Sequence, residues 1–195
     1  MKHIGRKLYH LLGGLGLLSL YYLLGRERAL WTYTILAGLV LAIDITRLKV
    51  PAFNHFLYTH FSSFLRQNEA SKLTGTAPYV LGIGLSLLFY RTEIATAAVC
   101  FLAVGDVAAT TIGERYGRTR IAGAKSLEGT IAFAVSATTA GFLLSAAGIH
   151  LPWHLIVAGA LIAAGVELLP LPVNDNFVIP LVSGGAMELL SRAAQ

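Results

Sequence analysis

The sequence predicts an all-α fold: a polytopic bundle of about seven transmembrane helices with one further amphipathic helix at the membrane interface. Of the 195 residues, 55% are hydrophobic and 13% are charged, whereas a soluble domain carries about 25% charged residues. The mean hydropathy is +0.67. The apolar residues fall into runs close to the roughly 20 residues that a helix needs to cross a bilayer. The whole chain, 1–195, is therefore expected to form a single integral membrane domain.

A basic segment containing Arg6 and Lys7 precedes the first apolar run, 11–24. Basic and apolar regions in this order also occur in secretory signal peptides. The small-residue cleavage site of such a signal is missing, however, and the charged residues 26–28 follow the run instead. We therefore predict an uncleaved first span.

Six further apolar runs predict the remaining spans. They cover residues 30–46, 74–90, 94–113, 127–147, 151–169 and 176–190. The stretch 51–66 mixes aromatic side chains with Asn54, His55 and His60, which makes it too polar to cross the membrane. It suits an amphipathic helix that lies flat at the interface.

The positive charges divide unequally between the two sides of the expected bundle. Eleven of the 15 Lys and Arg residues lie in the N-terminal segment and in the connections after the second and fourth spans. Because cytoplasmic loops carry the excess of Lys and Arg, we expect the N-terminus and the connections after the second, fourth and sixth spans in the cytoplasm. With seven spans, the C-terminus lies outside.

Carboxylates concentrate at the same, cytoplasmic ends of the spans. They are Asp44, Asp106, Glu128, Glu167 and Asp175. Asp106 lies well inside its apolar run, and an acid inside the bilayer costs at least about 2.5 to 3.5 kcal/mol. Since such residues usually face a polar cavity, Asp106 is the most informative single residue of the chain.

One helix face of this run combines a carboxylate, a hydroxyl and two glycines. At spacings of four, three and four residues, these are Asp106, Thr110, Gly113 and Gly117. Such a face could admit a bulky polar ligand. The alternative is that small residues at this spacing only allow close packing of helices.

The start of the run 127–147 predicts a phosphate site. Lys125 precedes Ser126, which is expected to cap the helix, and a helix N-terminus offers free backbone N–H groups and a positive dipole end to an anion. Two more cations lie just upstream, at Arg118 and Arg120. The alternative, that these cations only follow the distribution of positive charge in membrane proteins, does not explain the Lys-Ser-x-Glu-Gly arrangement that ends in Glu128 and Gly129.

A third element is Asn174-Asp175-Asn176, which lies between prolines at 172 and 180. Oxygen ligands on a short loop suit Mg²⁺, a hard cation that is commonly held by one or two carboxylates together with substrate phosphates. The alternative is a simple turn before a helix.

Several other classes of protein are excluded or poorly supported. Cys100 is the single cysteine, so the chain has neither a disulfide framework nor a cysteine metal site. The Gly-x-Ser-x-Gly elbow of hydrolases, the phosphate loop and the dinucleotide fingerprint are all missing. The net charge of +5 is scattered between apolar runs, which argues against nucleic acid and for a membrane surface and phosphate groups as partners.

In their order and spacing, these motifs resemble the membrane-integral CTP-dependent lipid kinases, the family of dolichol kinase, phytol kinase and CTP-dependent diacylglycerol kinase. The resemblance runs through most of the chain. It comprises Arg6, Lys7, Leu8, Tyr9 and His10 with Gly13 or Gly14; Asp44 and Arg47; Arg66, Glu69, Leu73, Thr74 and Gly75; Gly105, Asp106, Gly113 and Gly117; the segment 125–130, Lys-Ser-Leu-Glu-Gly-Thr; and the segment 175–180, Asp-Asn-Phe-Val-Ile-Pro.

The resemblance implies transfer of the CTP γ-phosphate to a lipid hydroxyl at the cytoplasmic leaflet. In that scheme Asp106 and Asp175 hold Mg²⁺, and Glu128 ligates the metal or orients the phosphates. His10 is a candidate base for the hydroxyl. The groups expected at the nucleotide and its phosphates are Arg6, Lys7, Gly105, Thr110, Gly113, Gly117, Arg118, Arg120, Lys125, Ser126, Gly129 and Asn176. Further site candidates are Asp44, Arg47, Arg66, Glu69 and Glu167.

Two alternatives of other classes stay open. A CDP-lipid synthase would use CTP at a similar acidic membrane site, but it would attack the α-phosphate and release pyrophosphate. A lipid transporter or scaffold would bind in the same cavity without turning over CTP. The acceptor itself, whether a polyprenol, a phytol-like isoprenoid alcohol or a diacylglycerol, is left open, because apolar tunnels accept prenyl and acyl chains alike. The sequence also leaves a homodimer open.

Overall fold

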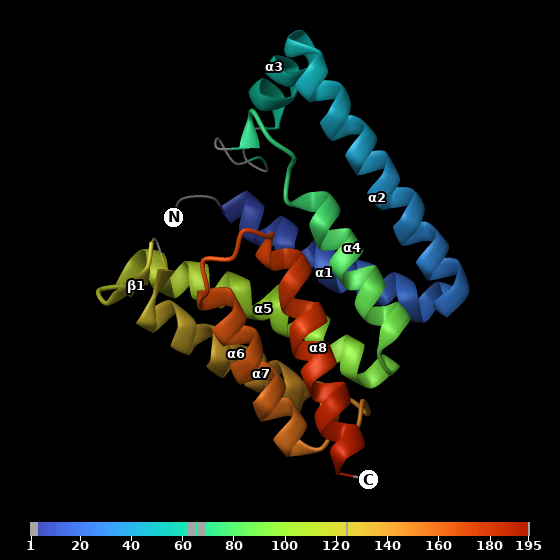
Figure 1. Cartoon of the computed structure of the whole chain (residues 1–195), viewed down its shortest axis with the longest axis vertical. Helices are drawn as coiled ribbons and strands as arrows, with labels where there is room; N and C mark the ends of the chain where they lie inside the picture. The colour runs from blue at the N-terminus through green and yellow to red at the C-terminus, as the bar shows by residue number, and fades with distance from the viewer. Residues whose placement is uncertain (1–3, 62–64, 66–68, 124, 195) are drawn as a thin grey trace.

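The computed structural model describes residues 4–61, 65, 69–123 and 125–194, without the side chains of Ile4 and Arg6. In this part of the chain, eight α-helices and one short β-hairpin form the structure (Figure 1). The helices are α1 (Ile4–Leu24), α2 (Arg26–Lys49), α3 (Pro51–His60), α4 (Thr76–Phe89), α5 (Thr92–Tyr116), α6 (Leu127–Ala146), α7 (Trp153–Leu168) and α8 (Asp175–Ala193). The antiparallel strands of the hairpin are β1 (Arg120–Ala122) and β2 (Lys125–Ser126).

The prediction of an α-helical bundle is confirmed, since every run that was expected to span the membrane lies within or around one helix. By length and composition, three helices of the described chain could cross a membrane, namely α2, α5 and α6. Two shorter helices, α4 and α7, are also apolar. The structure therefore shows several apolar helices, while the full number of seven spans stays a prediction.

Helix α3 corresponds to the expected interfacial helix, but it is shorter than predicted. Pro51 occupies its first turn, where the missing N–H of proline costs nothing, and the helix ends at His60 instead of continuing to residue 66. None of its residues is buried. Most of the remaining predicted stretch, including Arg66, lies outside the described residues.

Helix α5 forms the centre of the bundle and contacts α1, α6, α7 and α8. Its residues from 94 to 103 are all buried. Four of these ten residues are alanines, and their small side chains let neighbouring helices approach closely. The buried run leads directly to Asp106, so α5 carries this carboxylate out of the core toward one end of the molecule.

The outer surface of the bundle is strongly apolar. On α2, Trp31, Ile35, Leu39 and Ile43 are each exposed at intervals of four residues and form one continuous stripe. Soluble monomers rarely expose apolar patches of this kind. Together with the apolar helices, this surface indicates a multi-pass integral membrane protein whose outer faces contact lipid.

The connections between helices gather at two ends of the bundle. One pocket brings the starts of α1, α4 and α8 together with the second half of α5. A second pocket combines the α4–α5 and α6–α7 connections with the end of α8. We call the first end the basic end, because its connections carry most of the Lys and Arg residues, and the other the opposite end; in Figure 1, α3 lies on the side of the basic end and the C-terminus on the opposite side.

We expect the connections at the basic end to be cytoplasmic, because they hold the excess of positive charge. The test is single-cysteine labelling after the buried Cys100 is replaced by Ser. Cysteines introduced at Ser71 and Ile121 should react with an impermeant maleimide only after cells are opened. A control cysteine at Ala147, in the α6–α7 connection, should react in intact cells, and the reverse pattern would contradict the predicted orientation.

Candidate functional site

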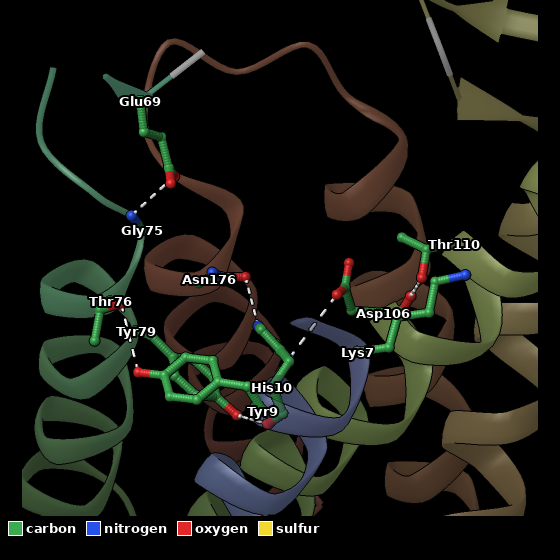
Figure 2. A pocket seen from close by; sticks show the side chains of 10 residues that line it. All are labelled: Lys7, Tyr9, His10, Glu69, Gly75, Thr76, Tyr79, Asp106, Thr110 and Asn176. Atoms are coloured by element: carbon green, nitrogen blue, oxygen red, sulfur yellow. Dashed lines mark hydrogen bonds and ion pairs between the residues drawn. The ribbon is translucent and has the colours of Figure 1, made fainter. Parts of the chain in front are cut away.

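A polar pocket lies at the basic end, where five parts of the chain meet (Figure 2). Helix α1, the loop before α4, α4 itself, α5 and α8 contribute its lining. The lining residues are Lys7, Tyr9, His10, Glu69, Gly75, Thr76, Tyr79, Asp106, Thr110 and Asn176. Because these residues come from distant parts of the sequence, the pocket exists only in the folded bundle.

His10 is held firmly in the centre of this pocket. Its ring stacks on Tyr79 with 4.3 Å between ring centroids, and the Tyr79 hydroxyl donates a 2.6 Å hydrogen bond to the His10 carbonyl. Nε2 lies 3.0 Å from Oδ1 of Asn176. Since an amide oxygen only accepts hydrogen bonds, a neutral His10 in this arrangement would carry its proton on Nε2 and donate it to Asn176.

The other ring nitrogen of His10 faces Asp106, as Figure 2 shows. Nδ1 lies 3.9 Å from Oδ2 of Asp106. Among the described residues, it is the one buried side-chain nitrogen or oxygen atom that has no hydrogen-bond partner. His10 is only 8% exposed. In a neutral ring with a protonated Nε2, Nδ1 is bare and can accept a proton from a bound group.

A lysine ammonium lies among carboxylates beside the pocket. Lys125 donates to the backbone carbonyl of Glu167, and Nζ lies 3.3 Å from Oε1 of Glu167 and 3.6 Å from Oδ2 of Asp175. Asp106 and Asp175 both act electrostatically on Glu167. The turns that end α7 and begin α8 are thus linked to the β-hairpin: two acids, Glu167 and Asp175, face the Lys125 ammonium, and Asp106 lies near enough to act on Glu167.

The structure brings together only part of the predicted Mg²⁺ ligands. Asp106 and Asp175 lie on the same side of the bundle as Glu167, but Glu128 accepts the backbone N–H of Thr119 at 3.1 Å and 3.3 Å and so holds the hairpin loop. No three His, Cys, Asp or Glu side chains of the described chain are arranged to hold a metal ion as they stand. The donor chemistry nevertheless fits a hard cation, since Glu167 and Asp175 offer carboxylate oxygens to the Lys125 ammonium and Asp106 offers a further carboxylate nearby.

Lys7 approaches the pocket from α1. Its ammonium pairs with Glu114 near the end of α5, with 2.7 Å between Nζ and Oε2. The side chain of Arg6 lies outside the described residues. Two predicted phosphate contacts, Lys7 and Lys125, therefore both engage acids in this structure.

The segment between α5 and α6 confirms the predicted helix cap at Ser126, but it holds Arg118 and Arg120 away from the pocket. Ser126 caps α6, because its hydroxyl oxygen accepts the N–H of Gly129 at 3.2 Å. Arg118 and Arg120 are exposed on the α5–α6 connection and do not line the pocket. They lie at the basic end, within the same connection as Lys125.

The glycines of α5 pack against α6 and Ser126 and do not line the pocket. A Cβ at Gly105 would come within 2.5 Å of the Phe133 ring, and one at Gly113 within 3.3 Å of the Ser126 hydroxyl. A Cβ at Gly129, on the facing helix, would lie 3.0 Å from the carbonyl of Ala109. Gly105, Gly113 and Gly129 thus allow α5 and α6 to approach closely, which is the alternative that the sequence left open. A Cβ at Gly117 would instead meet the carbonyl of Gly113 and the side chain of Ser126.

Thr110 does line the pocket, but its hydroxyl donates to the Asp106 carbonyl at 2.8 Å and to the Val107 carbonyl at 3.2 Å. This bonding to the preceding helical turn is usual for threonine inside a helix.

Among the further candidates, Glu69 lines the pocket, whereas Asp44 and Arg47 form a buried ion pair outside it. Sequence reasoning missed Tyr79 and Thr76 as pocket residues. Tyr79 lies in an apolar run of α4 and carries no signal of its own. Its relation to His10 follows from packing, which a single sequence does not reveal.

Comparison with known proteins adds an independent line of evidence. No protein-family model matches the chain, and no solved structure matches it significantly. The chain is 28% identical to CTP-dependent diacylglycerol kinase 1 of Saccharomyces cerevisiae, over 93% of this chain and 71% of that protein. It is 27% identical to CTP-dependent diacylglycerol kinase 1 of Schizosaccharomyces pombe, over 75% of this chain and 74% of that protein. It is 31% identical to probable phytol kinase 3, chloroplastic, of Glycine max, over 92% of this chain and 60% of that protein.

Proposed function

We propose that this chain, whose homologues across most of its length are membrane CTP-dependent lipid kinases, transfers the γ-phosphate of CTP to the hydroxyl of a membrane lipid alcohol. The homology is the observation that carries the proposal. A pocket with a histidine base, an acid and a lysine at one end of an apolar bundle supports it, because this reaction joins a water-soluble nucleotide to a lipid.

Phosphoryl transfer depends mainly on positioning the reactants and on neutralising charge. In the proposed reaction the acceptor O–H gives its proton to Nδ1 of His10, and the freed oxygen forms a bond to the γ-phosphorus. The bond from that phosphorus to the β–γ bridging oxygen breaks, and CDP leaves. Asn176 holds the opposite nitrogen of His10 and so keeps Nδ1 directed toward Asp106.

Lys7 and Lys125 are the proposed phosphate-binding cations. In the structure Lys7 pairs with Glu114 and Lys125 pairs with Glu167 and Asp175. Nucleotide binding would exchange these carboxylates for phosphate oxygens. Arg118 and Arg120 are close in sequence to Lys125 and could reach a phosphate chain that extends over the hairpin.

Asp106, Glu167 and Asp175 are the proposed holders of Mg²⁺, with Glu167 in the place that the sequence assigned to Glu128. When bound, the metal would neutralise charge on the phosphates. Lys125 occupies the space between two of these acids, so metal binding would free its ammonium for the nucleotide.

The acceptor is proposed to approach from the lipid along α1. Leu8 and Leu12 are about half exposed, and Tyr9, which lines the pocket, lies between them in sequence and is itself partly exposed. A hydrocarbon chain against this face would place its hydroxyl near His10. The chain length and type, whether isoprenoid or acyl, are not decided by this open surface.

The proposed function is tested with purified protein, Mg²⁺ and a panel of lipid alcohols that includes polyprenols, phytol and diacylglycerol. With CTP labelled at the γ-phosphate, label should appear in the lipid, while CTP labelled at the α-phosphate should yield only labelled CDP. Label from the α-phosphate in the lipid, with release of pyrophosphate, would instead identify a CDP-lipid synthase. Absence of turnover with every acceptor would favour a binding protein.

A further inference from the structure

The ion pair between Asp44 and Arg47 is among the most deeply buried polar features of the chain. Arg47 is 1% exposed and Asp44 is 2% exposed, and Nε of Arg47 lies 2.7 Å from Oδ1 of Asp44. Neither residue lines the pocket. Burying two charges is costly unless every polar atom finds a partner. The other hydrogen bonds of Asp44 and Arg47 therefore indicate the role of this ion pair.

The partners of both residues lie in the loop that leads into α4. Arg47 donates to the carbonyl of Glu69 at 3.1 Å and to the carbonyl of Lys72 at 2.6 Å. Asp44 accepts the backbone N–H and the hydroxyl of Thr74, both at 2.8 Å. From the next helix, Asn54 donates to the carbonyl of Ala70 at 2.9 Å.

This loop has little backbone structure of its own. In the described part of the chain, one turn bond between backbone groups lies within 69–75, from the N–H of Lys72 to the carbonyl of Glu69, at 3.2 Å. Side chains from α2 and α3 therefore supply most of the hydrogen bonds that fix it. The planar guanidinium of Arg47 can bind one carboxylate and two carbonyls at once, a geometry that a lysine cannot reproduce.

The loop in turn contacts the groups that orient His10. Glu69 accepts the N–H of Gly75 at 3.1 Å, and both residues line the pocket. A Cβ at Gly75 would lie 3.2 Å from Nδ2 of Asn174 and 3.4 Å from Nδ2 of Asn176, so the loop lies directly against the turn that begins α8. Asn176 holds His10.

We infer that Asp44 and Arg47 are positioning residues, which hold the loop 69–75 against the Asn174–Asn176 turn and thereby fix His10 in the pocket. They act through the loop and do not touch the reactants. The catalytic part of this inference rests on the proposed kinase function, whereas the structural part does not.

The test uses the full chain in lipid nanodiscs with three substitutions. Arg47→Lys keeps the charge beside Asp44 but cannot bind both carbonyls. Thr74→Val removes one hydroxyl contact to Asp44 and is the milder variant. Arg91→Lys is the matched control, since Arg91 pairs with Glu188 at the opposite end.

Two readouts do not need activity. Hydrogen exchange at the amides of Thr74 and Gly75 should speed up in Arg47→Lys, and less so in Thr74→Val, with no change in Arg91→Lys. Modification of His10 by diethylpyrocarbonate, followed in its peptide by mass spectrometry, should speed up in the same order. Equal exchange and equal His10 modification in Arg47→Lys and Arg91→Lys would overturn the inference, as would a loosened loop that leaves His10 protected.

The third readout is kinetic. For an active wild type, kcat of Arg47→Lys should fall by up to about a hundredfold, the size expected when a reacting group is displaced by about 1 Å, while KM for CTP changes little. The melting temperature of Arg47→Lys should fall below that of Arg91→Lys, because buried carbonyls lose a partner, so kcat is compared per folded protein. A loss of kcat that only follows the loss of folded protein would show a purely structural pair and overturn the inference. A wild type without CTP turnover would contradict the proposed function, and the exchange and modification data would still decide whether the pair positions His10.

Discussion

Asp106→Asn should yield a folded, membrane-inserted protein whose γ-phosphate transfer is reduced by roughly 10²- to 10³-fold, the range found when one electrostatic stabiliser of a transition state is removed. The substitution keeps the size of the side chain but removes the charge that faces Nδ1 of His10. Insertion should become easier, because an amide is cheaper than a carboxylate inside a bilayer. Mg²⁺ dependence should weaken together with activity.

A structural role for Asp106 leads to the opposite result. If the carboxylate only held helices together, Asp106→Asn would melt early and keep activity and Mg²⁺ dependence. Of its possible partners, Arg115 instead lies over the ring of Tyr116, 5.2 Å from the ring centroid, and Lys125 contacts Glu167 and Asp175. The measurement is melting temperature and transfer rate on one sample, with Glu188→Gln at the opposite end as the matched control.

Lys125→Ala should lower the use of CTP by about ten- to a hundredfold, since a charge-assisted contact is worth roughly 1.5 to 3 kcal/mol. The melting temperature should also fall, because Glu167 is 7% exposed and would lose its cation. The effect on catalysis is measured as kcat/KM for CTP, corrected for the folded fraction.

Arg91→Ala is the control for this variant. Arg91 also pairs with a glutamate, Glu188, but it does so at the opposite end. Its removal should leave kcat/KM for CTP near the wild-type value. Equal losses in the two variants would contradict a phosphate-binding role for Lys125.

The sequence was sufficient to predict the helices but not their full arrangement. Seven apolar runs matched seven helices, because hydropathy reports directly on the environment of a segment. Ser126 was correctly predicted as a helix cap, since capping is a local interaction. The hairpin of β1 and β2 was missed, because its five strand residues carry no alternating pattern long enough to detect.

The candidate site was predicted less completely, because its contacts are long-range. His10 and Asp106 both entered the prediction, but their approach depends on how α1 packs on α5. Glu128 was expected beside Asp106 and Asp175, yet its side chain turns back to the N–H of Thr119. Whether a long side chain turns toward its own loop or toward another helix depends on the fold, and spacing along the sequence does not encode it.

Helix α1 has an outer apolar surface and an inner polar one, since Leu8 and Leu12 are exposed on the outside of the bundle while His10 is buried in the pocket. A lipid acceptor that arrives along this helix never leaves the bilayer. Its effective concentration for the protein is then its mole fraction among the membrane lipids, and not its concentration in the aqueous volume. If the chain phosphorylates such an acceptor, dilution of the acceptor by other lipids should slow the reaction even when the total acceptor in the sample is unchanged, and the composition of the membrane would then regulate the rate.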